Sequence, residues 1–143
     1  MSFMFMNALI FSLLIGIGLF SNPKSPKDFR WEKRILISFG EDGFEEDFLE
    51  VHLKEIQERK LLLVHLVGDN LHWTNSEESL DLPGFLELRK QIRSGSSWAL
   101  IGLDGGIKNQ GTGKVPMELL FRQIDTMPMR QSEIRRNNGK DGL

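Results

Sequence analysis

The stretch Ile35-Leu36-Ile37-Ser38-Phe39 is a short apolar run that ends at Gly40. A second apolar run, Leu61 to Val67, ends at Gly68. Continuous runs of this length are typical of strands that are buried on both faces of a sheet. The residues between the two runs predict a helix, because apolar side chains recur at spacings of three and four, at Phe44, Phe48, Leu49, Leu53 and Ile56. Strand, helix and strand with short connections predict a right-handed crossover between two parallel strands.

The start of this helix has the pattern of a capping box. Asp42 is followed three residues later by Glu45. An Asp in the first position can accept a hydrogen bond from the free amides of the first helical turn. The pattern therefore predicts a helix that begins just after Asp42.

Prolines indicate where two later helices begin. Asp81 and Pro83 are typical of a helix start, and the apolar spacing that follows predicts a helix to about Arg93. Pro116 is predicted at the first position of a helix, since its fixed φ angle suits a helix start. The helix that it begins must end before Pro128.

The dipeptide Asp104-Gly105 separates two short runs, residues 97–103 and 106–109. It tolerates the positive φ angles of a tight turn, so the two runs predict a β-hairpin. A short basic helix over residues 129–136 is expected after the last proline. The order of a βαβ unit, a helix, a β-hairpin and a C-terminal helix predicts the α/β class. We interpret it as a thioredoxin-like fold with a mixed four-stranded sheet.

The first residues are typical of a targeting segment. Residues 1–21 carry no charged side chain, and Ala8 to Phe20 is almost wholly apolar. This run is closer to the apolar core of a signal peptide, about 7 to 15 residues, than to the roughly 20 residues of a spanning helix. We expect residues 1–21 to be a signal peptide of an exported, periplasmic or extracellular protein. An uncleaved inner-membrane anchor is the alternative, because no Lys or Arg precedes the run.

This assignment divides the rest of the chain into three parts. Residues 22–28 are expected to form a linker, residues 29–136 the thioredoxin-like domain, and residues 137–143 a disordered tail. Contact with a membrane is expected only through the N-terminal segment, if that segment is retained. Net charge is −2 over 143 residues, which gives no general affinity for polyanions, so we expect no nucleic-acid partner.

The chain contains no cysteine. Disulfide exchange and cysteine-dependent peroxidase chemistry both need a thiolate, which thioredoxins place at the start of the helix after the first strand. The corresponding segment here reads Gly40-Glu41-Asp42-Gly43. Thiol redox activity is therefore excluded. No other set of residues converges on a catalytic pattern, so we expect no catalytic residues and no cofactor.

Two further patterns could bind small ligands. His65, Asp69 and His72 could surround a metal ion, but their spacing matches no zinc pattern, and His65 lies within an apolar run, so we expect structural histidines and no metal. The segment Gly111-Thr112-Gly113-Lys114 could bind an anion ahead of the last helix, although it lacks the spacing of a Walker motif. An ordinary glycine-rich connection is the favoured interpretation. The alternative is a cysteine-independent enzyme that acts on a small anionic substrate near Gly111–Lys114.

Three segments carry a family resemblance. They are Phe29-Arg30-Trp31, the hairpin from Ile101 to Lys108, and Ile124-Asp125-Thr126-Met127-Pro128-Met129-Arg130. Together they resemble the family called domain of unknown function 4174, over roughly residues 28–136. The signature residues are Asp104, Gly105, Gly106, Lys108, Asp125, Met127, Pro128, Met129 and Arg130. Leu103 departs from the family pattern, which usually has Lys at that position.

The resemblance implies a fold and a cellular location. Members of the family resemble thioredoxins and peroxiredoxins but are poor in cysteine. They occur as exported bacterial proteins and as modules of animal proteins associated with the extracellular matrix. The family brings no established catalytic residues, so the resemblance implies a thioredoxin-like fold and export without an activity.

Candidate contact residues are aromatic or basic. Trp73 is expected in a polar loop, as an exposed contact residue, whereas Trp98 is expected in the core. Two interpretations of Arg130 are open. In the first, Arg130 pairs with a neighbour such as Asp125, and Met127 and Met129 fill gaps in the core. In the second, Arg130 belongs to a basic docking surface for an acidic partner or a lipid head group. That surface would also contain Arg135 and Arg136, and Lys114 is the candidate for anion binding. We therefore expect an exported, non-redox module that binds a protein or a cell-envelope component.

Overall fold

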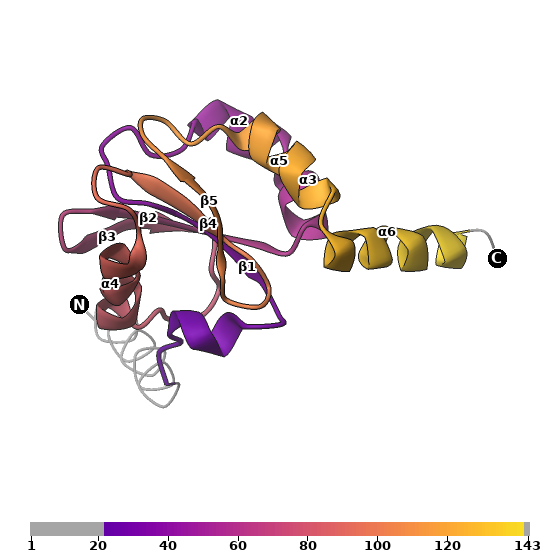
Figure 1. The fold of residues 1–143 in the computed structure, drawn as a ribbon, viewed down its shortest axis with the longest axis horizontal. Helices are drawn as coiled ribbons and strands as arrows, with labels where there is room; N and C mark the ends of the chain where they lie inside the picture. Colours follow the sequence, from indigo (N-terminus) through magenta and orange to yellow (C-terminus); the bar gives the residue numbers. More distant parts are fainter. Residues whose placement is uncertain (1–21, 142–143) are drawn as a thin grey trace, which may run out of the picture.

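The computed structural model describes residues 22–141, so the predicted signal peptide or anchor lies outside the described residues. One central sheet is covered by helices on both faces (Figure 1). The elements in chain order are η1 Pro26–Phe29, β1 Arg34–Ser38, α2 Glu46–Val51, α3 Leu53–Glu58, β2 Leu61–Val67, β3 Asn70–Thr74, α4 Leu82–Gln91, β4 Trp98–Ile101, β5 Ile107–Gly111, α5 Met117–Asp125 and α6 Pro128–Asp141. Among these residues, no helix combines the length and apolar character that crossing a membrane requires.

The five strands form one mixed sheet in the order β3-β2-β1-β4-β5. Strands β1 and β2 are parallel, as the crossover pattern predicted, and the other neighbours are antiparallel. The predicted hairpin is confirmed as β4 and β5. The prediction of four strands is wrong, because Asn70–Thr74 adds β3 at the edge next to β2. This strand is mostly exposed, so it lacks the apolar run by which the buried strands were found.

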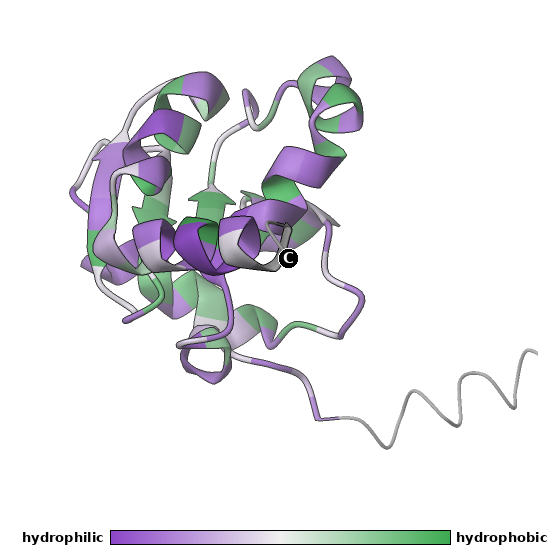
Figure 2. Cartoon of the chain, turned by 90° about the vertical axis from the view of Figure 1, so that its right-hand side faces the viewer, coloured by the Kyte–Doolittle hydropathy of each residue, from purple (hydrophilic) through white to green (hydrophobic). Residues whose placement is uncertain are grey.

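The two central strands contribute to a separate core on each face of the sheet. Leu36 and Leu63 lie in the cluster that includes side chains of α2, α3 and α5. Ile35 and Leu62, one residue earlier in each strand, lie in the cluster that includes side chains of α4. This alternation follows from the period of two of a strand. In Figure 2 the strands inside the molecule are coloured hydrophobic, whereas the helix that ends at the C-terminus is mainly hydrophilic.

The predicted first helix is present but divided. It forms α2 and α3, which meet at His52, where φ is −111° and ψ is 23°. The His52 ring stacks on Phe48 at 3.8 Å between ring centroids, and its Nδ1 lies 2.9 Å from the Phe48 carbonyl oxygen. The capping-box prediction is wrong, because Glu45 is the N-cap residue and Asp42 belongs to the preceding loop. Gly43 separates Asp42 from the helix with a φ of +51°.

The boundaries at both ends of the domain differ from the expected ones. Lys24 forms a bridge with Leu80 and an ion pair with Glu78 at 2.9 Å, so part of the expected linker packs on the domain. The helix expected over 129–136 is α6, which begins at Pro128 and continues to Asp141, into the segment expected to be a disordered tail. The helix extends away from the rest of the molecule (Figure 1). The helix expected at Pro116 is α5, with Pro116 as its N-cap.

Candidate functional site

A groove of about 530 Å³ lies beside the loop that follows β1. Its residues come from that loop, from the start of the α2–α3 segment, and from β2 and β3. We call it the β3–α2 groove. Its volume falls in the range of about 300 to 1,000 Å³ that is typical of ligand sites.

A β-bulge shapes the β3 side of the groove. His65 pairs with Trp73, but the next residue of β2, Leu66, pairs with Leu71, so His72 is an extra residue in the pairing. A bulge of this kind redirects side chains locally. As a result His72 and Trp73, although consecutive in a strand, both line the groove.

His65 forms the floor of the groove and is 8% exposed. Its Nε2 lies 2.6 Å from the carbonyl oxygen of Gly40, so this nitrogen carries the proton and donates to the oxygen. The predicted structural histidine is thus held to the loop after β1. Its ring lies edge-on to Phe44, with centroids 6.1 Å apart, and 4.9 Å from the ring of His72.

These histidines do not assemble the metal site that was considered from the sequence. Asp69, the third member of that set, pairs instead with Arg89 at 3.1 Å. Within residues 22–141, no group of three metal-ligating side chains converges. The chemistry of the groove is therefore that of aromatic rings, imidazoles and carboxylates.

Trp73 is the exposed aromatic residue of the groove. It belongs to the edge strand β3 and not to a polar loop, and it is 39% exposed. Its ring contacts Phe44, with centroids 6.1 Å apart and planes at 65°. A partly exposed indole packed on a second ring offers a large, rigid contact area, a property of residues that dominate binding interfaces.

Carboxylates form the α2 side of the groove. They are Glu41, Asp42, Glu46 and Glu50, all exposed. None of the ion pairs found in the described part of the chain includes any of them. Four negative charges without a paired cation give this side of the groove a negative potential.

The first group of signature residues stabilises the tight turn of the hairpin. Asp104 accepts hydrogen bonds from the Lys108 ammonium and from the Gly106 amide, both at 2.9 Å. These bonds, the Lys108 one first, lower the pKa of Asp104 below its ordinary value. Gly105 has a φ of +86°, and the Arg30 side chain packs so closely that a Cβ at Gly105 would lie 2.6 Å from Arg30 Nε.

The second group of signature residues attaches α6 to the rest of the domain. Asp125 accepts hydrogen bonds from Arg59 at 2.7 Å and from Arg130 at 3.1 Å. Burial raises the pKa of Asp125, but the two guanidinium groups outweigh burial and lower the pKa overall. The predicted pairing of Arg130 with Asp125 is confirmed. Arg130 is 6% exposed, so it does not join an exposed basic surface with Arg135 and Arg136.

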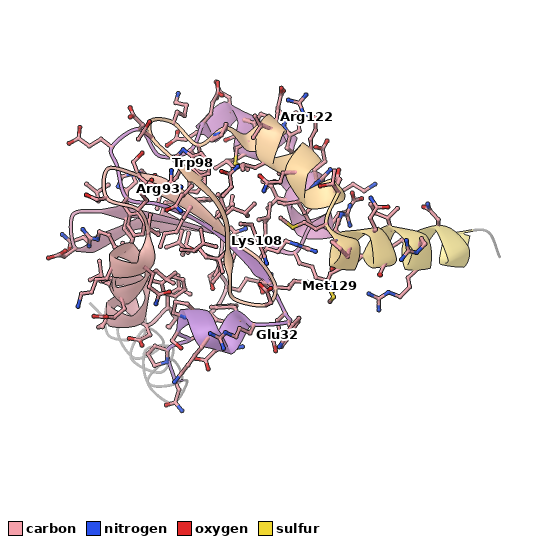
Figure 3. The ribbon with its side chains drawn as sticks, in the orientation of Figure 1. Glu32, Arg93, Trp98, Lys108, Arg122 and Met129 are labelled. Carbon is pink, nitrogen blue, oxygen red and sulfur yellow. The ribbon has the colours of Figure 1, made fainter. Side chains whose placement is uncertain are left out.

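The two signature methionines have different environments. Met127 packs against the core cluster on the α5 face. Met129, labelled in Figure 3, is 46% exposed on α6, so the expectation that both methionines fill core gaps is wrong for Met129. Pro128 is the first residue of α6, where its missing amide hydrogen costs no helical hydrogen bond.

Residues 25–133 match the family described as a domain of unknown function (DUF4174). The chain belongs to this family. The match includes η1 and the first turns of α6, both groups of signature residues, and the whole β3–α2 groove. No curated protein and no solved structure matches the chain significantly.

In this DUF4174 domain, the glycine-rich segment ahead of α5 lies on another surface. Lys114 is exposed and lines a cavity of about 520 Å³, together with Arg122, Glu45 and Glu118. The carbonyl oxygens of Thr112 and Gly113 accept hydrogen bonds from the Trp98 indole and the Ser97 hydroxyl. These contacts hold the loop against the buried Trp98.

The remaining predicted contact residues lie apart from the groove. Arg135 and Arg136 are exposed on α6, and Arg135 donates a hydrogen bond to the Ser132 hydroxyl at 3.2 Å. Of the predicted contact residues Trp73, Lys114, Arg130, Arg135 and Arg136, only Trp73 lines the groove. The sequence did contain a signal for strand β3, which carries His72 and Trp73. Gly68-Asp69, between Val67 and Asn70, is typical of a two-residue hairpin turn.

Proposed function

We propose that this chain is an exported, non-redox binding module of thioredoxin-like architecture, which binds a protein or a cell-envelope component through the β3–α2 groove. The observation that carries the proposal is the groove itself, with the partly exposed Trp73 packed on Phe44. Aromatic residues in such a position commonly supply much of the affinity of an interface.

The strand arrangement supports the thioredoxin-like architecture. Strands β2, β1, β4 and β5 are neighbours in that order, with a parallel pair joined to an antiparallel hairpin. Strand β3 is then an addition at the edge beside β2. In such an arrangement the groove adjoins the segment after the first strand, where thioredoxins have their thiols. The chain has no cysteine, so this region is available for binding without redox chemistry.

Export is supported by the apolar character of residues 1–21. Cell fractionation with mass measurement of the mature N-terminus tests this part of the proposal. A mature chain in the periplasm or the medium that begins near residue 22 supports export with cleavage. A full-length chain in the inner membrane supports the anchor, and a full-length chain in the cytoplasm contradicts export.

The groove is tested by site-specific photo-cross-linking in cells that express the chain naturally. A photoreactive amino acid replaces Trp73 in one variant and Trp31 in a matched control. Trp31 is also exposed but precedes β1, whereas the groove follows β1, so the two positions lie at opposite ends of that strand. We expect a discrete adduct from position 73 and none from position 31. The proposal fails if position 73 yields no adduct.

The alternative of an enzyme acting on an anionic substrate near Lys114 has less support. Glu45 and Glu118 line the same cavity as Lys114 and Arg122, and their charges oppose the binding of an anion.

A further inference from the structure

The charge of the β3–α2 groove restricts what can occupy it. Its four carboxylates come from the loop after β1 and from α2. The next cation along the chain, Lys54, already faces Glu58 at 3.9 Å. An anionic occupant, such as a nucleic acid or an acidic lipid head group, would meet uncompensated negative charge here. A cationic occupant would be attracted.

The apolar part of the groove adds a second requirement. Leu53 is 56% exposed and Trp73 is 39% exposed, and both line the groove. The exposed apolar surface favours an occupant with apolar side chains. The face of an indole also attracts a Lys or Arg side chain placed over it.

We infer that the occupant of the β3–α2 groove is a basic segment of a protein partner. The segment places a Lys or Arg side chain among Glu41, Asp42, Glu46 and Glu50, and an apolar side chain against Trp73 and Leu53. A volume of about 530 Å³ accommodates a few side chains of such a segment. This inference rests on the proposed function, and it adds the chemistry of the partner.

Fluorescently labelled peptides of equal length test the inference by fluorescence anisotropy. One alternates Lys with Leu, a second alternates Glu with Leu, and a third alternates Lys with Ser. We expect the Lys/Leu peptide to bind more tightly than either of the others, because only this peptide meets both requirements. Its affinity for the protein should fall as NaCl rises from about 50 mM to about 500 mM, since salt screens the exposed carboxylates.

Charge-matched variants assign the effect to the groove. The double variant Glu46→Gln/Glu50→Gln should bind the Lys/Leu peptide about three- to tenfold more weakly, as expected for the loss of two exposed ion pairs. The control Glu55→Gln/Glu77→Gln removes the same number of charges from exposed residues that do not line the groove. The control should bind within about twofold of the unmodified chain. Thermal unfolding of each variant verifies that the fold is intact.

The outcomes separate this inference from the proposed function. If the Glu/Leu peptide binds as tightly as the Lys/Leu peptide, or if the groove variant keeps full affinity, the inference is wrong. It is also wrong if none of the three peptides binds. If the photoreactive residue at position 73 nevertheless captures a partner, the proposed function is still supported and only the inference is wrong. If position 73 yields no adduct, the proposed function and the inference are both wrong.

Discussion

Gly43, in the loop after β1, packs against His65 at the floor of the groove. Its φ is +51°, a left-handed conformation that other residues rarely adopt. A Cβ at this position would lie 2.4 Å from Cε1 of His65, so the imidazole occupies the space that a side chain would need. The same ring donates to the carbonyl of Gly40. The position of the groove floor therefore depends on a residue without a side chain.

Replacing Gly43 by Ala should destabilise the protein by about 2 to 4 kcal/mol, the combined effect of a left-handed alanine and an overpacked ring. Gly68→Ala is the matched control, because Gly68 has a φ of +60° with no atom within 4 Å of an added Cβ. The control should lose only about 1 to 2 kcal/mol. Guanidinium chloride denaturation measures both. Equal losses would show that the contact with His65 is unimportant.

Asp125 should make stability depend on pH. Burial raises its pKa, but Arg59 and Arg130 lower it overall from 3.8. A carboxyl whose pKa is lower in the folded state stabilises the fold above its unfolded-state pKa, and this stabilisation is lost as pH falls through the folded-state pKa. Asp125→Asn should therefore be less stable than the unmodified chain at pH 7.

The difference between Asp125→Asn and the unmodified chain should shrink as pH falls from about 5 to about 3. Urea denaturation at each pH measures this difference. Asp104→Asn is the control, because Asp104 also has a lowered pKa but lies in an exposed hairpin turn. Solvent screening should make its effect smaller. A difference that stays constant over the pH range for Asp125→Asn would contradict the role of this carboxyl.

Helix α6 is attached to the rest of the molecule through buried charges. Glu133 faces Arg34 at 3.4 Å, Arg130 at 3.6 Å and Lys60 at 3.8 Å. Arg34, at the start of β1, is almost fully buried and also donates to the carbonyl of Arg59. Helix α6 is mainly hydrophilic (Figure 2). We therefore expect this network, together with the ion pair between Arg130 and Asp125, to hold α6 against the rest of the molecule.

Glu133→Gln should destabilise the protein by about 3 to 5 kcal/mol, because it leaves the buried Arg34 without its carboxylate. Glu118→Gln is the control, since Glu118 is exposed on α5, and its loss should stay within about 0.5 kcal/mol. Urea denaturation measures both. The double variant Arg34→Met/Glu133→Leu removes both charges and should recover part of the stability. Equal effects of the two single variants would contradict the network's role.

Among the elements, β3 shows why prediction from the sequence was incomplete. Buried strands were found by their apolar runs, and β1 and β2 occur where those runs lie. Strand β3 is held by backbone pairing at an edge of the sheet, which imposes little constraint on side-chain polarity. Its bulge depends on the register with β2, so the joint exposure of His72 and Trp73 to the groove could not be derived from alternation alone.

At the scale of the whole molecule, the domain begins earlier than residue 29. Lys24 pairs with Glu78 at 2.9 Å, and its backbone bridges to Leu80. Phe29 is buried against Phe85, with ring centroids 6.4 Å apart. The family match, which begins at residue 25, agrees with this boundary.

A chain that begins at Arg30 should therefore be less stable than one that begins at Asn22 by at least about 3 kcal/mol, the usual loss for a buried phenylalanine. Thermal and urea unfolding of the two chains measure the difference. Phe29→Ala in the longer chain should reproduce most of this loss of stability. That result would assign the loss to the core contact of Phe29 and not to the bridge at Lys24. Equal stability of the two chains would place residues 22–29 outside the folded unit.

The sequence by itself determined the α/β class, the parallel pair, the hairpin, the family resemblance and the absence of cysteine. Period, turn residues and composition act within a few residues of one another, so they can be recognised along the chain. Only the tertiary structure decided that Trp73 and His72 face the carboxylates of α2, and that Arg130 is buried in an ion network. Those arrangements depend on packing between segments that are far apart in the chain, and local patterns carry no information about which of them meet.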